Sequence, residues 1–302
     1  MEFPTLGRRR LLELGAGGVT AAVLAGCAPV SDGLTASRAE VRSGSFTSRF
    51  RPDTGTNWSV AIPGGSAGSD QQPLPVALFL HGTGADHRMV FDDLQADRVL
   101  AQHVARGGQP FAIAAVDGGE SWWHRRATGT DTQSMVVEEF LPLLASQGLD
   151  TGRTAVFGLS MGGFGALPLA SQHRLPGLRA VAAMSPAVWS MHDAGRADNF
   201  DGAADFEAND IFALRPELEM LPKRIDCGTA DNLLYSVKDY VSGLPGVHEG
   251  GFQDGGHDSG YWRSILPDVI SFLGRNLACP PAQHSAHPAP VRSYGADSAA
   301  PV

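Results

Sequence analysis

The chain contains 302 residues, of which 43% are hydrophobic and 18% charged, and its formal net charge is -9. This composition is typical of a globular protein and excludes a mostly disordered chain. The acidic charge, without any basic stripe, argues against a nucleic-acid-binding protein. Three cysteines are too few for a disulfide scaffold and lack the paired spacing of a zinc ribbon, whereas the 37 glycines require an explanation.

The first 26 residues are typical of an export signal. Arg8-Arg9-Arg10 precedes an apolar, small-residue run from Leu14 to Ala25, which is too short and too glycine-rich to favour a transmembrane helix. The arginines followed by leucines resemble a twin-arginine signal. The run ends in Leu24-Ala25-Gly26-Cys27, which resembles a bacterial lipobox, so Cys27 is predicted to carry a lipid anchor. The alternatives are a plain cleaved signal and an uncleaved anchor.

The catalytic core is predicted at residues 51–277, a length that suits one domain. Residues 27–50 are rich in Ser, Arg and Gly and predict a tether, and residues 278–302 are rich in Pro, Ala, Ser and His and predict a disordered tail. Cys227 and Cys279 could pair in an oxidising compartment. Because Cys227 falls in a predicted core strand and Cys279 in the tail, the favoured interpretation is that they do not pair.

Short apolar runs alternate with longer amphipathic stretches through the core. Strands are predicted at 75–80, 111–116, 154–157, 179–184 and 224–227, and helices at 88–105, 133–146, 161–172 and 261–277. This alternation predicts an α/β fold with a mostly parallel central sheet and helices on both faces. Residues 185–221 interrupt the alternation and predict a small cap, whose acidic residues favour a solvated face over a calcium loop. Each predicted strand ends in a turn, usually glycine-bearing, and ligands bind at this edge of such sheets.

The turn Gly158-Leu159-Ser160-Met161-Gly162 fits the pattern G-x-S-x-G between a predicted strand and a predicted helix. A sharp strand-to-helix turn holds such a serine in a strained conformation, and small neighbours let the backbones pass. The helix N-terminus favours negative charge that develops on reaction. Ser160 is therefore predicted to be a nucleophile, with an accidental serine in a glycine-rich turn as the alternative. A standard phosphate-binding loop is excluded because no glycine-rich turn carries Lys-Ser or Lys-Thr.

A serine nucleophile needs a base and a third group that orients the base. His257 lies in a loop just before the last helix, at the expected edge of the sheet, and is predicted to be the base. Asp231 directly follows a strand and completes the order Ser, Asp, His, so it is predicted to be the acid. Asp226 lies inside that strand and is expected to be buried, while Asp254 and Asp258 flank the histidine too closely to reach its far nitrogen.

A tetrahedral intermediate needs two backbone donors for its oxyanion. The N–H of Met161, which follows the serine, is predicted to be one donor. The other is predicted to be the N–H of Thr83, with Gly82 and Gly84 as alternatives, and His81 is expected to be structural.

The sequence Trp122-Trp123-His124 follows the second predicted strand and its turn. These three residues are predicted either to form a wall of the acyl or alcohol pocket, or to cover the core beneath the loop. Both interpretations remain open from the sequence.

Several motifs recur in an order that resembles one family. They are Leu80-His81-Gly82-Thr83-Gly84, Asp117-Gly118-Gly119 with Trp122-Trp123-His124, Glu139-Phe140-Leu141-Pro142, Gly158-Leu159-Ser160-Met161-Gly162-Gly163, Gly228-Thr229-Ala230-Asp231 and Gly256-His257-Asp258 with Trp262. Over residues 55–277 the chain resembles the esterase D-like family of α/β hydrolases, which includes feruloyl and acetylxylan esterases, S-formylglutathione hydrolase and the secreted mycolyltransferases. The resemblance implies an α/β-hydrolase fold with Ser160, His257 and Asp231 as the triad and Thr83 and Met161 as oxyanion donors.

Three functions are compatible with these residues. The favoured one is an exported serine esterase that acts on a small-molecule, lipid or carbohydrate ester. The alternatives are an acyltransferase similar to the mycolyltransferases and a non-catalytic cell-surface binding module. No cofactor or metal is expected, because the sequence lacks a His-x-x-x-His pair on a helix and a dinucleotide fingerprint after a strand.

Overall fold

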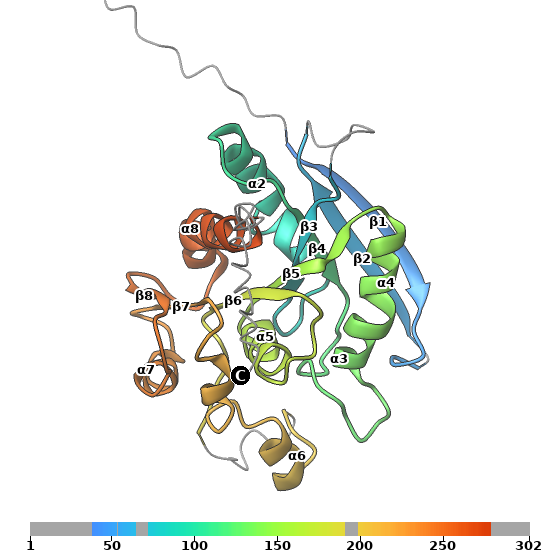
Figure 1. Cartoon of the computed structure of the whole chain (residues 1–302). Coiled ribbons are helices and arrows are strands. Elements are labelled where there is room, and N and C mark those ends of the chain that lie inside the picture. The colour runs from blue at the N-terminus through green and yellow to red at the C-terminus, as the bar shows by residue number, and fades with distance from the viewer. Residues whose placement is uncertain (1–37, 53, 65–71, 191–198, 279–302) are drawn as a thin grey trace, which may run out of the picture. The chain divides into compact units, whose positions relative to one another are not determined.

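A computed structural model of the chain describes residues 38–52, 54–64, 72–190 and 199–278 (Figure 1). The predicted export signal, Cys27, Cys279 and all of the predicted tail except Ala278 lie outside these residues. Within the described ranges, none of the helices is long and apolar enough to cross a bilayer.

The described strands form one eight-stranded sheet in the order β1-β2-β4-β3-β5-β6-β7-β8. Strands β3 to β8 pair in parallel, whereas β2 pairs antiparallel with β1 on one side and with β4 on the other. This arrangement confirms the predicted mostly parallel sheet. The strands are β1 (Glu40–Thr47), β2 (Gly55–Ile62), β3 (Pro75–Leu80), β4 (Ala112–Val116), β5 (Asp150–Leu159), β6 (Leu178–Met184), β7 (Lys223–Gly228) and β8 (Glu249–Gln253).

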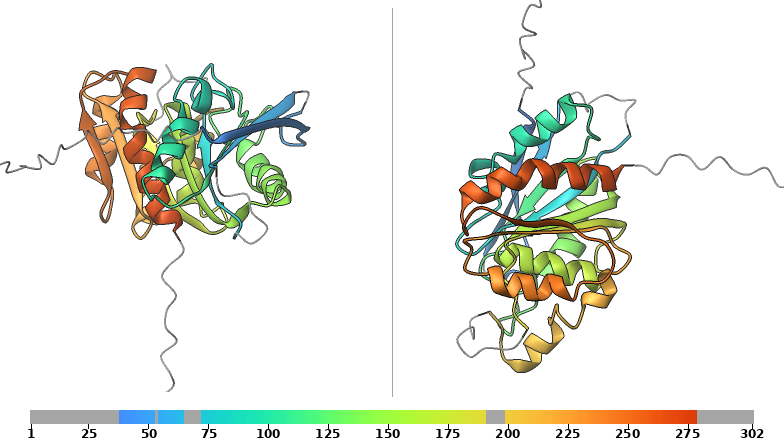
Figure 2. Two further views of the ribbon diagram at one scale, coloured as in Figure 1. Left: turned by 90° about the horizontal axis from the view of Figure 1, so that it is seen from above. Right: turned by 90° about the vertical axis from the view of Figure 1, so that its left-hand side faces the viewer.

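Helices cover both faces of the sheet (Figure 2). Because successive side chains of a strand point to opposite faces, Leu78 of β3 joins one apolar cluster while Phe79 joins the other. The cluster around Leu78 includes residues of α3, α4, α5 and α7, and the cluster around Phe79 includes residues of α1, α2 and α8. The helices are α1 (Met89–Asp92), α2 (Ala96–Ala105), α3 (Thr132–Met135), α4 (Leu141–Ser146), α5 (Met161–Ser171), α6 (Ala203–Ala208), α7 (Leu234–Ser242) and α8 (Ser259–Leu277).

The predicted tether at 27–50 is wrong for its second half. Residues 40–47 form β1, which pairs with β2 along its whole length, and Ala39 is buried beside them. The sequence did not indicate this strand because β1 is mostly exposed and carries polar side chains such as Glu40 and Arg42. Its stability comes from backbone pairing with β2 rather than from an apolar run.

Two predicted helices are interrupted in the structure. The helix expected at 88–105 breaks into α1 and α2 at Gln95, which has a φ of 55°. The helix expected at 133–146 contains a π-helical turn at Val136–Phe140 between α3 and α4. Both interruptions keep the apolar side of each segment against the sheet.

The predicted cap excursion, residues 185–221, extends the core in its described part. It contains α6 and a 3-10 turn at Arg215–Leu218, and Phe200, Phe206 and Phe212 join the apolar cluster that contains α5. Residues 191–198 of the excursion lie outside the described residues. Its acidic Asp205 accepts hydrogen bonds from within the excursion itself. In the described ranges no group of three His, Cys, Asp or Glu side chains is arranged to hold a metal ion.

Candidate active site

Ser160 stands at the sharp turn between β5 and α5. Its φ of 52° and ψ of -118° lie outside the ordinary regions for an L-residue. The turn is held by a 3.0 Å hydrogen bond from the Ser160 N–H to the Met184 carbonyl, and the Ser160 carbonyl accepts from Ala187. A side chain at Gly162 would place its Cβ 1.9 Å from the Leu80 carbonyl oxygen, so only glycine lets α5 approach β3 this closely.

His257 and Asp231 reach Ser160 from two other loops at the same edge of the sheet. The distance from His257 Nε2 to Ser160 Oγ is 3.0 Å, and that from His257 Nδ1 to Asp231 Oδ2 is 2.9 Å. The second carboxylate oxygen, Oδ1, accepts a 2.8 Å bond from the Leu233 N–H. Because a carboxylate only accepts, Nδ1 carries the imidazole proton and Nε2 is free to accept the proton of Ser160. The structure thus brings the three predicted residues together.

The other nearby acids have different partners. Asp226 is fully buried in β7 and receives two hydrogen bonds from Arg224, and burial raises the pKa of this carboxyl although Arg224 opposes the shift. Asp258 caps α8 by accepting from the N–H groups of its first turn. Asp254 accepts from the Thr229 hydroxyl. These contacts leave Asp231 as the acid that orients His257.

The turn after β3 lies directly against Ser160. A Cβ on Gly82 would lie 3.5 Å from the Ser160 Cβ and 2.8 Å from the Leu159 side chain, so the backbone of this turn passes close to the serine. In the described part of the chain, neither the Thr83 N–H nor the Met161 N–H has a hydrogen-bond partner. The Gly84 N–H is already bound to Glu120 Oε1 at 2.7 Å, which removes Gly84 as an alternative oxyanion donor.

His81 braces this turn as a neutral side chain. Burial lowers the pKa of His81 below its ordinary value. Its Nε2 accepts a 2.9 Å bond from the Gly118 N–H, so Nδ1 carries the proton and donates to the Gly82 carbonyl at 2.8 Å. The Trp123 indole donates to the His81 carbonyl at 3.0 Å.

Trp123 is fully buried, and its ring packs against Gly118 and Gly165. The interpretation of Trp123 as a wall of the substrate pocket is therefore wrong, and the core interpretation describes it. Its indole fills the space that two glycines leave beneath the turn. The sequence could not distinguish the two roles because both place an aromatic residue after the second strand.

His124 is also buried, so its interpretation as a substrate-binding residue is wrong as well. Its Nε2 lies 3.0 Å from the Asn199 carbonyl, and its ring stacks on Phe200 at a centroid distance of 5.3 Å. His124 thereby ties the loop after β4 to the excursion. Trp122 is half-buried and packs edge-on against Phe164 and at a tilt against Trp189, so it remains a predicted pocket residue.

A further contact of the site was not assigned a role from the sequence. The Trp262 ring stands edge-on to the His257 imidazole, with ring centroids 5.0 Å apart and an interplanar angle of 83°. The Trp262 Nε1–H donates to the Ser185 hydroxyl at 3.1 Å, which fixes the indole. The sequence signals were its place in the recurring motif Gly256-His257-Asp258 with Trp262 and its position one turn into α8, five residues after the histidine.

Comparison with protein families matches residues 51–273 to the family described as "Putative esterase". The chain belongs to this family. Its members are α/β hydrolases, as the motifs predicted. None of the curated protein sequences is significantly similar to the chain.

Solved structures of an esterase and of two other hydrolases share the fold. A ferulic acid esterase has a TM-score of 0.68 and 21% identity, and the match covers 79% of this chain and 98% of that one. The S-formylglutathione hydrolase of Agrobacterium tumefaciens has a TM-score of 0.66 and 18% identity, and the match covers 79% of this chain and 95% of that one. The fluorophosphonate-binding serine hydrolase F of Staphylococcus aureus has a TM-score of 0.66 and 19% identity, and the match covers 78% of this chain and 98% of that one. At these identities the likeness concerns the fold, and it confirms the predicted α/β-hydrolase fold.

Proposed function

We propose that this member of the "Putative esterase" family hydrolyses carboxylic esters through a covalent acyl-enzyme on Ser160. The observation that carries the proposal is the unbroken hydrogen-bond chain from Asp231 through His257 to Ser160. A serine hydroxyl is a weak nucleophile at neutral pH, and a base in hydrogen-bond contact activates it. The placement of Ser160 at the N-terminus of α5 adds a favourable field for negative charge.

In the proposed reaction, the Ser160 oxygen attacks the ester carbonyl while its proton passes to His257 Nε2. The carbonyl oxygen becomes an oxyanion and is stabilised by the N–H groups of Thr83 and Met161. The tetrahedral intermediate collapses, the C–O bond to the alcohol breaks, and the alcohol takes the proton from His257. Water then gives a proton to His257 and attacks the acyl carbon, which forms a second tetrahedral intermediate. As this intermediate collapses, the bond from the acyl carbon to the Ser160 oxygen breaks, His257 returns its proton to Ser160, and the acid is released. Asp231 stabilises the His257 imidazolium during both acylation and deacylation.

The direct test replaces Ser160 with alanine and follows the hydrolysis of p-nitrophenyl acetate. The Ser160→Ala variant is expected to lose at least about 10³ in kcat, since the covalent step is removed. Ser146→Ala is the matched control, because this exposed serine donates to the Leu143 carbonyl at the end of α4, away from the proposed triad. Full activity of Ser160→Ala, with both variants folded, would overturn the proposal.

The substrate class is addressed by a panel of esters. The names of the related structures, ferulic acid esterase and S-formylglutathione hydrolase, suggest that the panel include a feruloyl ester and a thioester beside p-nitrophenyl esters of increasing acyl length. Hydrolysis and acyl transfer compete for the same acyl-enzyme. Adding a trehalose-type acceptor and analysing the products separates the proposed esterase from an acyltransferase.

We also propose that the chain is exported and carries a lipid on Cys27. The support is the basic and apolar run that ends in Leu24-Ala25-Gly26-Cys27. Metabolic labelling with a clickable fatty acid is expected to mark the wild-type protein and not Cys27→Ala. Equal labelling of both proteins, or labelling of neither, would contradict this assignment.

A further inference from the structure

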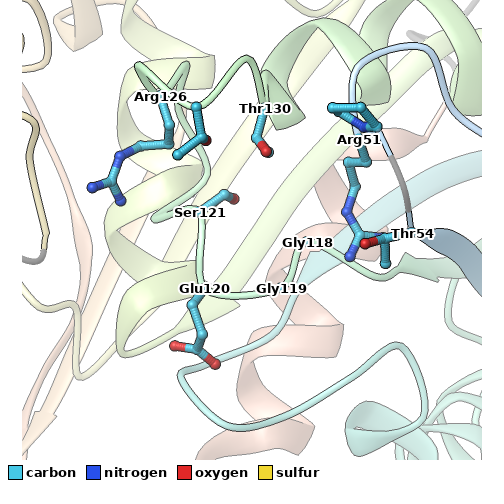
Figure 3. Close-up of a pocket in the computed structure, with 10 residues that line it drawn as sticks. Arg51, Thr54, Gly118, Gly119, Glu120, Ser121, Arg126 and Thr130 are labelled. Atoms are coloured by element: carbon cyan, nitrogen blue, oxygen red, sulfur yellow. The ribbon is translucent and has the colours of Figure 1, made fainter.

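A pocket of about 400 Å³ opens next to the turn after β4 (Figure 3). Figure 3 shows the Arg51 side chain extending along one side toward Gly118 and Gly119. The pocket adjoins the proposed oxyanion turn, because Glu120 in its wall holds the Gly84 N–H. Its lining residues are Arg51, Pro52, Thr54, Gly118, Gly119, Glu120, Ser121, Arg126, Thr128 and Thr130.

Arg51 is a buried cation without an ion-pair partner among the residues that the structure describes. Only 9% of its surface is exposed, and its Nη1 donates to the Thr56 hydroxyl at 3.1 Å. Across the described residues, no carboxylate lies within 4.0 Å of its guanidinium. The nearest electrostatic influence is Asp117, whose oxygens already accept hydrogen bonds from Asn57 and His87. Burial of an unpaired charge is costly, so a site that retains one is expected to offset the cost with a ligand.

The part of the pocket wall next to this cation is main chain. Gly119 has a φ of 58°, and a Cβ there would lie 3.3 Å from Arg51 Nη2, so the guanidinium head sits directly beside the Gly119 main chain. The N–H groups of Gly119, Glu120 and Ser121 make no hydrogen bond within the part of the chain that the structure describes. A guanidinium fork beside unbonded main-chain N–H groups is a suitable set of donors for an oxyanion.

The two other charged residues of the wall have partners of their own. Arg126 forms an ion pair with Asp201 at 2.9 Å, and Figure 3 shows its guanidinium directed away from Arg51. The Glu120 carboxylate accepts from Gly84 and also points away from Arg51 in Figure 3. Arg51 is therefore the charge in this pocket that is available to a ligand.

We propose that Arg51 binds the carboxylate or phosphate group of a small ligand in this pocket. The guanidinium offers up to four N–H donors beyond the one on Thr56, and two parallel bonds to such a group give both affinity and orientation. The ligand is either an ester substrate that carries an anionic group or a free anion. The site stands on its own geometry and does not depend on the proposed esterase activity.

Calorimetric titration of the full chain with inorganic phosphate and with acetate tests the proposal. Wild-type protein is expected to bind at least one of them, and Arg51→Met is expected to bind about tenfold more weakly or not at all. The matched control is Arg98→Met, which removes an exposed arginine of α2 and is expected to bind as the wild type does. No binding by the wild type, or equal binding by Arg51→Met, would overturn the proposal.

Two further measurements separate this role from a merely structural one. Phosphate or acetate is expected to raise the melting temperature of the wild type and not that of Arg51→Met, and in anion-free buffer Arg51→Met is expected to be at least as stable as the wild type. Thr56→Val removes the hydroxyl that holds the guanidinium with little change in shape, and it is expected to weaken binding several-fold even if Arg51→Met does not fold. Unchanged binding by a folded Thr56→Val would count against the site. So would an equal rise in melting temperature for the wild type and for Arg51→Met.

Inhibition kinetics with phosphate or acetate distinguish an anionic group of the substrate from a free anion. If phosphate or acetate inhibits hydrolysis competitively in the wild type, the site holds an anionic group of the substrate. If the anion binds without changing kcat/KM for a neutral p-nitrophenyl ester, the site holds a free anion. Anion binding is measured by calorimetry and does not require ester hydrolysis. An inactive enzyme would therefore overturn the proposed function, while the same titration would still test the anion site.

Discussion

The substitution Asp231→Asn tests the orientation of the catalytic base. In the structure both carboxylate oxygens accept: Oδ2 from His257 Nδ1 at 2.9 Å and Oδ1 from the Leu233 N–H at 2.8 Å. An asparagine has one acceptor oxygen and one donor NH₂ group. If its oxygen keeps the bond to Leu233, its NH₂ faces His257 Nδ1, and both contacts remain hydrogen bonds only when Nδ1 has lost its proton to Nε2. The preferred state of the variant therefore places a proton on the nitrogen that must accept one from Ser160.

The expected cost is large for activity and small for stability. The same exchange in a serine protease triad lowers kcat by about 10⁴, which corresponds to about 5 kcal/mol of transition-state stabilisation. Because the contacts of residue 231 with His257 and with Leu233 both remain hydrogen bonds after the tautomer change, the free energy of unfolding is expected to change by no more than about 1 kcal/mol.

The assay is the steady-state hydrolysis of p-nitrophenyl acetate, with urea unfolding of the same preparations. Asp254→Asn is the matched control, because Asp254 lies near His257 in sequence but bonds to the Thr229 hydroxyl. The control is expected to keep nearly wild-type kcat. A folded Asp231→Asn that retains more than a tenth of wild-type kcat would refute the reasoning.

Three other predictions follow from close contacts. Gly162→Ala would place a Cβ 1.9 Å from a main-chain oxygen of β3, so it is expected to destabilise the fold by more than about 3 kcal/mol in urea unfolding. Gly55→Ala is the control and should cost far less, because no heavy atom of the described residues lies within 4 Å of a Cβ built there; equal costs would contradict the close approach of α5 to β3. Burial raises the pKa of the Cys227 thiol to about 12, so in a variant without the other cysteines it should not react with an aromatic disulfide reagent at pH 8 until the protein is unfolded; rapid reaction of the native form would contradict this. Trp262→Phe keeps an aromatic ring beside His257 but loses the hydrogen bond to the Ser185 hydroxyl. The value of kcat should fall more than KM changes, and the free energy of unfolding should drop by about 1 kcal/mol. An unchanged kcat would show that the indole does not position the base.

The central strands were predictable because they are buried on both faces. Residues 75–80 match β3, and the neighbouring β4, β5, β6 and β7 lie where apolar runs indicated them. The edge strands β1 and β8 were missed for the opposite reason: β1 is mostly exposed, and β8 (Glu249–Gln253) consists of residues that are exposed or half-buried, with two consecutive glycines. Strand β2 was missed although most of it is buried, because polar residues break up its apolar side chains. Backbone pairing defines such strands, and pairing partners are distant in sequence.

The site residues were predictable where chain order and turn chemistry decide their place. Ser160, Asp231 and His257 each follow a strand or precede a helix at the same edge, so the fold class alone brings them together. Burial of Trp123 and His124 depended instead on which glycines and aromatic rings from distant segments surround them. Local sequence does not contain that information.

The central claim is that Ser160 is the nucleophile, and labelling with a fluorophosphonate followed by peptide mass spectrometry tests it most directly. One adduct per chain is expected, on the peptide that contains Ser160, and prior denaturation is expected to abolish it because His257 no longer contacts the serine. An adduct on another residue, or no adduct on the folded protein, would contradict the account.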